Sequence, residues 1–264
     1  IVSDKAQTTR NRIICVYTDE EKQIVFMDTP GVHKPKHKLG EFMVDAAIES
    51  LKETEAVLFV VAGNEKRGPG DNFIIEQLKR VKVPVFLVVN KIDTLQKEQV
   101  LEAIVSYQDA YPFAGVIPIS AKNKENLSEL LNVLGEHLPE GPQYFPEDMI
   151  TDQPERLIIS DIVREKILLS TRDEIPHAIA VDVDEMKTRD DGTTYIRATI
   201  YCERDSQKGI IIGNKGALLR KIGAEARIDI QKLLATKVYL DLWVKVKKDW
   251  RNKSGILSEL GYKK

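Results

Sequence analysis

Three short polar segments in the first half of the chain carry residues suited to holding a purine nucleotide. They are Asp28-Thr29-Pro30-Gly31, Asn90-Lys91-Ile92-Asp93 and Ser120-Ala121-Lys122. The Asp93 carboxylate can accept two N–H bonds from the Watson–Crick edge of guanine, whereas adenine offers no such pair of donors there. Asn90 can bond the other edge of the base and tie the segments together, while Lys91 can lay its stem along the ring. The small Ala121 lets the base approach and offers its backbone N–H to the guanine oxygen.

The phosphate end of such a nucleotide would lie near the first segment. Asp28 suits a place beside Mg²⁺, where its carboxylate would hold a metal-bound water. Gly31 lets its backbone N–H reach a γ-phosphate, because no side chain obstructs the approach. Upstream, the hydroxyl of Thr9 can ligate Mg²⁺ when a γ-phosphate is present. We therefore predict a metal, γ-phosphate and switch site at Thr9, Asp28 and Gly31, and we assign none of the three as a certain catalytic group.

The elements that precede these segments are expected to bring them together. Apolar, β-branched runs lie at residues 23–27, 57–61, 85–89 and 116–119, and stretches with helical spacing lie at residues 41–53, 71–80, 96–110 and 126–137. This alternation predicts a parallel sheet covered on both faces, with residues 12–18 added as an antiparallel edge strand. Ligands bind beyond the carboxyl ends of parallel strands, so all three segments are expected to surround one ligand.

The plain alternative for any one of these segments is a turn or a helix cap, since Asp, Asn, Ser and Gly are ordinary loop residues. Asn-Lys-x-Asp by itself has a chance expectation of about 0.03 in a chain of this length. Because three such segments occur in the expected order at the ends of successive strands, a nucleotide site is favoured over three unrelated turns or caps.

A phosphate-binding loop of the form Gly-x-x-x-x-Gly-Lys-Ser/Thr does not occur in the sequence. Residues 63–68 have the glycine spacing, but Pro69 stands where Lys is required. Residues 209–216 hold their Lys between the glycines and not after them. We expect the loop and its strand to precede Thr9, outside the chain as given. The chain as given is then expected not to bind GTP tightly, because the phosphates would lack most of their cradle.

A second motif, Gly213-Asn214-Lys215-Gly216, points to RNA. Two glycines remove side-chain bulk, so a sugar-phosphate backbone can pass close to the N-terminus of the helix that follows. Lys208 and Lys215 add positive charge, while Ile210 and Ile212 are expected to form an apolar floor for bases. A tight turn between two helices is the alternative. From residue 204 to 264 the chain has 15 Lys or Arg against 6 Asp or Glu, whereas the rest of the chain has 24 against 35. This asymmetry favours a polyanion as the partner of the basic C-terminal region only.

A Pro- and Gly-rich stretch at residues 138–146 separates the two halves. Beyond it, helical spacing at residues 155–171 is followed by strand-like residues 177–186 and 193–203, helical residues 206–212 and 217–234, and a last strand at 237–246. Strands that follow one another or flank a helix pair predict an α+β domain. We place the first domain at residues 1–140, a linker at 141–154 and the second domain, with a C-terminal helix, at 155–264. No apolar run approaches the roughly 20 residues that span a bilayer.

Together the two halves resemble the Era family of bacterial GTPases. The resemblance rests on Gln7-Thr8-Thr9-Arg10, the three nucleotide segments, Leu138-Pro139-Glu140-Gly141-Pro142, Gly213-Asn214-Lys215-Gly216 and Leu242-Trp243-Val244-Lys245-Val246. It implies an α/β P-loop GTPase-type domain with a mostly parallel sheet, truncated at its N-terminus here, followed by an α+β type II KH domain.

The resemblance further implies a protein that hydrolyses GTP, with GTP or GDP and Mg²⁺ as cofactors. It implies binding near the 3′ end of 16S rRNA and a role in assembly of the small (30S) ribosomal subunit, without DNA. We expect a cytoplasmic monomer, with association at the inner face of the cell membrane as a further implication. Val32 follows Gly31 where Ras-like proteins have a Gln that orients water, so intrinsic hydrolysis is expected to be slow.

Two other functions compete with an RNA-binding GTPase. The chain as given could act only as a nucleotide-independent RNA-binding fragment, which the absent phosphate loop favours. Alternatively, the second domain could bind protein, which its basic charge and its Gly-x-x-Gly motif argue against.

Overall fold

The computed structural model describes residues 8–32, 35 and 37–262. In the first half, β1 (Ile13–Thr18) and β2 (Gln23–Asp28) form an antiparallel hairpin. A three-stranded parallel sheet in the order β3-β4-β5 contains β3 (Val57–Ala62), β4 (Val85–Asn90) and β5 (Gly115–Pro118). The helices are α1 (Lys38–Ser50), α2 (Pro69–Leu78), α3 (Lys97–Gln108) and α4 (Leu127–Gly135). These elements lie within one or a few residues of the ranges expected from the sequence.

The central strand β4 explains why its sequence is apolar without alternation. Leu87 and Val89 belong to a cluster that includes residues of α2 and α3, whereas Phe86 and Val88 belong to a second cluster that includes residues of α4. Successive side chains of a strand point to opposite faces, so both faces of this sheet are covered.

The expectation that residues 23–27 belong to the parallel sheet was wrong in one respect. β2 is hydrogen-bonded to β1, and within the described residues neither β2 nor β3 has a partner strand on its other edge. The middle of β3 is correspondingly open, because Val60 is 54% exposed although it is a β-branched residue in a core-type strand. The hairpin and the parallel sheet are therefore two separate sheets here.

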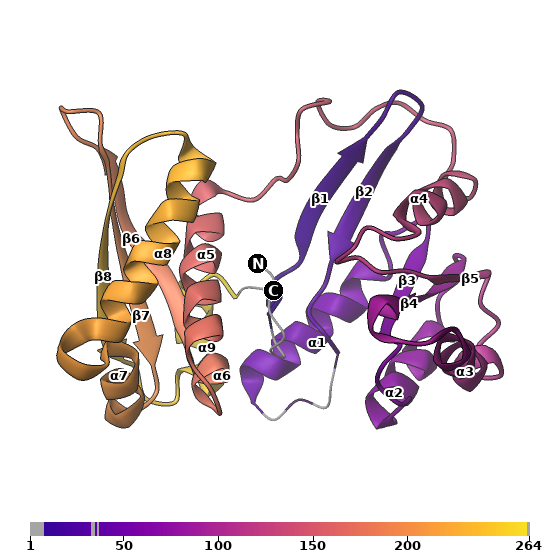
Figure 1. Cartoon of the computed structure of the whole chain (residues 1–264), viewed down its shortest axis with the longest axis horizontal. Coiled ribbons are helices and arrows are strands. Elements are labelled where there is room, and N and C mark those ends of the chain that lie inside the picture. Colours follow the sequence, from indigo (N-terminus) through magenta and orange to yellow (C-terminus); the bar gives the residue numbers. More distant parts are fainter. Residues whose placement is uncertain (1–7, 33–34, 36, 263–264) are drawn as a thin grey trace.

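The stretch expected as a linker is held against the hairpin. The backbone N–H of Val16 donates to the Ile150 carbonyl at 2.8 Å, and the Thr151 hydroxyl donates to the Ile14 carbonyl at 2.6 Å. At the far end of the hairpin, the Gln23 amide nitrogen donates to the Phe145 carbonyl at 2.9 Å. Figure 1 shows this segment passing from α4 over the tip of the hairpin to the second half. The domain bounds at 1–140, 141–154 and 155–264 stay a prediction.

The second half contains one mixed sheet with helices on one side. Its elements are α5 (Glu155–Ser170), α6 (Ile175–Ala178), β6 (Ala180–Thr188), β7 (Thr194–Cys202), α7 (Asp205–Ile212), α8 (Ala217–Leu234), β8 (Val238–Val246) and α9 (Ser254–Glu259). β6 pairs antiparallel with β7, and β7 pairs parallel with β8. His177, expected to begin the first strand, lies in the short helix α6, which Pro176 helps to start because a proline fits the first helical turn.

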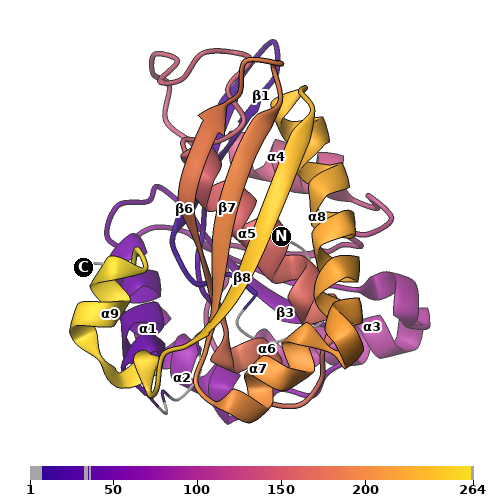
Figure 2. The ribbon, with the colours of Figure 1, turned by 90° about the vertical axis from the view of Figure 1, so that its left-hand side faces the viewer.

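The two halves meet through α1 and the C-terminal end of the chain. Figures 1 and 2 both place α1 beside α9. Leu39 and Met43 of α1 share a buried cluster with Trp250, which lies in the short helix η3 (Trp250–Asn252), and with Leu257 of α9. Of the helices in the described residues, none is long and apolar enough to cross a membrane.

Candidate nucleotide and RNA sites

The two segments expected to read the base contact each other directly. Asn90 ends β4, and its Oδ1 accepts the backbone N–H of Ala121 at 3.0 Å. The Ser120 hydroxyl, fully buried, donates to Asp93 Oδ1 at 2.7 Å. Lys91 takes a left-handed conformation with φ 68°, which turns the chain into the 3₁₀ helix Ile92–Thr94 that carries Asp93. This geometry holds the Asp93 carboxylate at the surface with one oxygen already fixed.

Two details of this site differ from the simplest picture of base binding. The Ala121 N–H, expected to reach the base, donates to Asn90 in the structure, so a nucleotide oxygen would have to share or replace that bond. The ammonium of Lys91 lies 3.8 Å from a Glu65 carboxylate oxygen, an exposed pair that a nucleotide can displace at little cost. Lys122 is exposed beside them.

The residues expected at the phosphate end form a second group. The Thr9 hydroxyl donates to Asp28 Oδ2 at 3.0 Å. Two oxygen atoms this close could both act as ligands of Mg²⁺, which is usually held by one or two protein oxygens together with phosphates and water. After Asp28, Thr29 is half-buried, Pro30 is buried and Gly31 is exposed. Side-chain hydrogen bonds join Thr9 to Asp28 and, separately, Asn90 to Ala121 and Ser120 to Asp93, so we describe the predicted site residues as two clusters.

Arg10, next to Thr9, was given no role from the sequence and proves to be buried in the contact between the halves. Its guanidinium donates to the carbonyls of Ile179 at 2.6 Å, Pro176 at 3.3 Å and His177 at 3.4 Å. It also lies 5.9 Å from the centroid of the Trp250 ring. Burial lowers the pKa of this guanidinium. A charged residue that is 2% exposed thus joins the segment containing Thr9 to the second half.

Further polar contacts join the same two regions. A guanidinium nitrogen of the buried Arg164, in α5, donates to the carbonyl of Thr8. At the start of α1, the Lys38 backbone N–H donates to Asn252 Oδ1 at 3.3 Å, and its ammonium donates to the Ser254 hydroxyl at 3.2 Å. The segment that contains Thr9 and the start of α1, which follows Gly31 in the chain, are therefore both attached to the second half.

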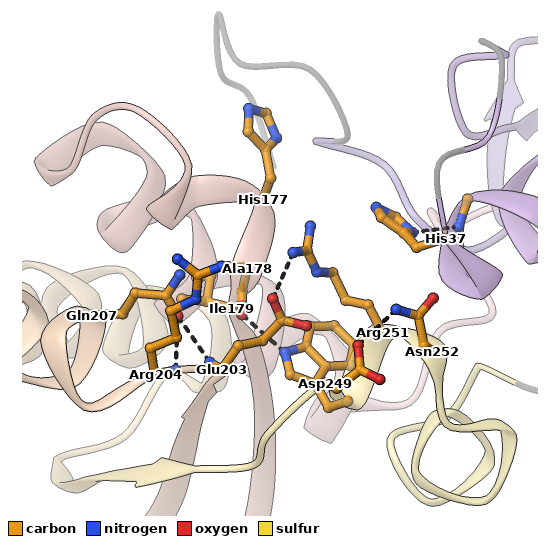
Figure 3. A network of polar contacts seen from close by, with 12 residues as sticks. His37, His177, Ala178, Ile179, Glu203, Arg204, Gln207, Asp249, Arg251 and Asn252 are labelled. Atoms are coloured by element: carbon orange, nitrogen blue, oxygen red, sulfur yellow. Dashed lines mark hydrogen bonds and ion pairs between the residues drawn. The ribbon is translucent and has the colours of Figure 1, made fainter.

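A polar network continues from this contact towards the Gly-x-x-Gly loop (Figure 3). The Trp250 indole N–H donates to the Ala178 carbonyl at 2.9 Å, and the Arg251 guanidinium donates to a Glu203 carboxylate oxygen at 2.5 Å. Gln207, in the first turn of α7, accepts the Glu203 N–H at 2.9 Å. Helix α7 ends at this loop, so these contacts connect Arg10 to the predicted RNA site through the backbone between Trp250 and Arg251 and through helix α7.

The Gly-x-x-Gly loop has a conformation that its sequence requires. Gly213 has φ 72°, and a Cβ there would lie 2.8 Å from the Leu218 Cβ. Gly216 has φ 78°, but a Cβ there would meet nothing within 4 Å. Lys215 also has a positive φ, of 47°. The first glycine is thus needed for both space and conformation, and the second for conformation alone.

The predicted RNA-contacting residues lie around this loop with different exposure. Asn214 and Lys215 at its tip are exposed, as is Ile210, at 53%. Ile212 and Lys208 are half-buried, and Ile212 packs against the core of the second half. The apolar floor at the surface is therefore formed by Ile210 more than by Ile212.

Comparison with known proteins places both halves. A family model described as a 50S ribosome-binding GTPase matches residues 1–91, and a KH-domain model matches residues 174–251. A structure of Era from Aquifex aeolicus bound to GDP and AlF4⁻ is 41% identical, with a TM-score of 0.95, over 99% of this chain and 90% of that one. The chain belongs to the Era GTPase family. A structure of Era in complex with MgGDPNP and nucleotides 1506–1542 of 16S ribosomal RNA is also 41% identical, with a TM-score of 0.96, over 99% and 89% of the two chains.

Membership in the Era family confirms the fold class expected from the sequence, a GTPase domain with a parallel sheet followed by a KH domain. It also confirms that the protein is a GTPase. The roles of the individual nucleotide and RNA residues stay predictions.

Proposed function

We propose that this Era-family GTPase couples its guanine-nucleotide state to the binding of rRNA near the 3′ end of 16S rRNA, during assembly of the 30S subunit. The observation that carries the proposal is the buried Arg10, which belongs to the same segment as Thr9 and bonds three carbonyls of the KH half. A rearrangement of Thr9 on loss of a γ-phosphate would shift the neighbouring Arg10 and weaken its hydrogen bonds to the KH half.

The cofactors are GTP or GDP and Mg²⁺, and the related Era structures contain GDP with AlF4⁻ or MgGDPNP. Asp93 would select guanine, with Asn90 and Ser120 holding it in place. Thr9 and Asp28 would hold Mg²⁺, and Gly31 would contact the γ-phosphate. Bound Mg²⁺ supplies charge stabilisation for phosphoryl transfer. With Val32 after Gly31, the chain has no glutamine there to orient water, so we expect slow hydrolysis until another group or a partner assists.

The RNA part of the proposal is supported by the loop geometry and by the related complex. A loop with two glycines at positive φ and with exposed Asn214 and Lys215 opens onto the N-terminus of α8, where backbone N–H groups favour phosphates. The similar Era structure contains nucleotides 1506–1542 of 16S rRNA. The role in 30S assembly, the cytoplasmic location, a monomeric state and any association with a membrane rest on the family resemblance.

Replacing Asn214 and Lys215 together with Asp tests the RNA site. Both side chains are exposed, so the fold should persist, while two carboxylates in the phosphate path should weaken binding of a 16S 3′-end oligonucleotide by at least tenfold. Filter binding measures this with a protein that also contains a phosphate-binding loop before Thr9, which we call full-length protein. Wild-type affinity should also fall with added salt as phosphate contacts release counterions.

The matched control replaces Asn132 and Lys82 with Asp, two exposed residues of the GTPase half. It makes the same chemical changes away from the loop and should bind like the wild type. Equal affinities for the loop variant and the control would refute the assignment of the RNA site.

A further inference from the structure

The sheet of the KH half has an outer face that the described helices leave uncovered. Figure 2 views this face, with β6, β7 and β8 in front of α5. On β8, Leu240 and Leu242 pack into the core on the helix side. The residues that alternate with them, Tyr239, Asp241 and Trp243, therefore point the other way.

The residues of this outer face form a cross-strand arrangement of rings and cations. They are Arg189, Tyr195, Arg197, Tyr239, Asp241 and Trp243, and we call them the outer aromatic face. Tyr195 of β7 stands opposite Tyr239 of β8, with ring centroids 5.9 Å apart and planes inclined by 16°. Arg189 lies 4.9 Å from both ring centroids, and Arg197 lies 5.7 Å from that of Tyr195. Tyr239 and Trp243 are each 54% exposed.

A single carboxylate holds this arrangement in place. Asp241 Oδ2 accepts the Tyr195 hydroxyl at 3.0 Å, the Trp243 indole N–H at 3.1 Å and the Arg197 Nε–H at 3.2 Å. Burial alone would raise the pKa of Asp241, but these three donors outweigh burial and lower it. An exposed tryptophan whose indole is tethered loses less rotational freedom when a ligand stacks on it.

We propose that the outer aromatic face binds single-stranded RNA, with bases stacked on Tyr239 and Trp243 and phosphates near Arg189 and Arg197. Aromatic rings on a sheet beside arginines form a stacking platform that accepts any base, since every base has a flat face. The inference rests on the proposed RNA function, which it extends to a second surface.

The charge of Arg189 favours RNA over a protein as the occupant. Among the described residues Arg189 forms no ion pair, and its guanidinium lies 4.9 Å from the ring centroids of both Tyr195 and Tyr239, so its charge is available to a phosphate beside the stacked rings. The Thr236 hydroxyl donates to the Gly192 carbonyl at 3.2 Å, which places this end of the sheet at the C-terminal end of α8, whereas the loop at Gly213 precedes its N-terminal end. An RNA that occupies both surfaces must therefore span the length of α8.

Two oligonucleotides separate the two surfaces. A KH loop clamps about four nucleotides, so an RNA of about five should occupy the loop alone and one of about twelve should reach both surfaces. In full-length protein, Tyr239→Ala with Trp243→Ala should leave affinity for the short RNA unchanged and lower affinity for the long RNA at least about tenfold. Tyr239→Phe with Trp243→Phe keeps the rings and should retain most of the affinity.

Fluorescence supplies a readout that a loss of folding would not reproduce. The chain has two tryptophans, and the other, Trp250, is fully buried. The long RNA should quench emission from Trp243, and Trp243→Phe should abolish that quenching. The variant with Asp at 214 and 215 should need more RNA for the same quenching.

The outcomes distinguish this inference from the proposed function. If neither RNA binds the wild type, the proposed RNA function fails. If both RNAs bind but the long RNA neither quenches Trp243 nor depends on the two rings, the inference is overturned and the face is left to a protein partner.

Discussion

At the scale of single residues, selectivity for guanine depends on how Asp93 is held. Its carboxylate is exposed, yet one oxygen is fixed by the buried Ser120 hydroxyl at 2.7 Å. An oriented carboxylate can meet two donors of the base at once, which a freely rotating one does only part of the time. The Asn90 side chain fixes the neighbouring loop through Ala121 in the same way.

We predict that Asp93→Asn in full-length protein weakens GTP binding by about tenfold or more and favours xanthosine nucleotides, because an amide suits the altered base edge. Competition binding with both nucleotides measures the change. Asp109→Asn, at an exposed position after α3, serves as the control and should leave both affinities alone. Unchanged affinity for GTP in the Asp93 variant would mean that this residue does not contact the base.

A companion substitution, Ser120→Ala, tests the support for Asp93 without touching its charge. Losing the hydroxyl frees the carboxylate, and we expect GTP affinity to fall by a smaller factor than with Asp93→Asn, about twofold to tenfold. The same competition assay applies. A loss as large as that of Asp93→Asn would assign Ser120 a direct contact with the base.

At the scale of elements, the two glycines of the loop between α7 and α8 are not equivalent. Gly213→Ala meets both a positive φ and a contact of 2.8 Å, whereas Gly216 has open space around it. We predict that Gly213→Ala lowers the free energy of unfolding by about 1–3 kcal/mol and abolishes RNA binding. Gly216→Asn should be tolerated, because asparagine accepts the left-handed region.

Thermal unfolding and filter binding compare these two variants. Similar losses in both would contradict the account, since they would show that any side chain in the loop is harmful.

The sequence predicted the elements well because their apolar periods are strong. The β4 run and the alternating β8 run each match the strand that the structure contains, and the base-reading loops follow from strand ends. Pairing was harder to foresee, because nothing in the 23–27 run itself reveals which strand lies beside it. The role of Arg10 was also missed, since burial of a charged side chain depends on carbonyls more than 160 residues away in the chain.

At the scale of the whole molecule, Arg10 is the residue that most directly joins the two halves. We predict that Arg10→Ala loosens their contact, because buried carbonyls that lose a donor cost about 1–3 kcal/mol each. Trp250 should then become more accessible to water, and its emission should shift to the red. The shift is read in a Trp243→Phe background, where Trp250 is the remaining tryptophan.

Arg12→Ala removes an exposed arginine that pairs with Glu53, and it is the control for this experiment. It should leave the Trp250 emission unchanged. Arg10→Lys should not restore the contact, since an ammonium cannot donate along a plane to three carbonyls while stacking on an indole.

The most direct test of coupling between nucleotide and RNA is the affinity of full-length protein for a 16S 3′-end RNA in two nucleotide states. We predict that the affinities with a non-hydrolysable GTP analogue and with GDP differ at least about fivefold, in the range typical of coupled sites. We also predict that Arg10→Ala reduces this ratio towards one while the RNA still binds. Equal affinities in the two states of the wild-type protein would contradict the account.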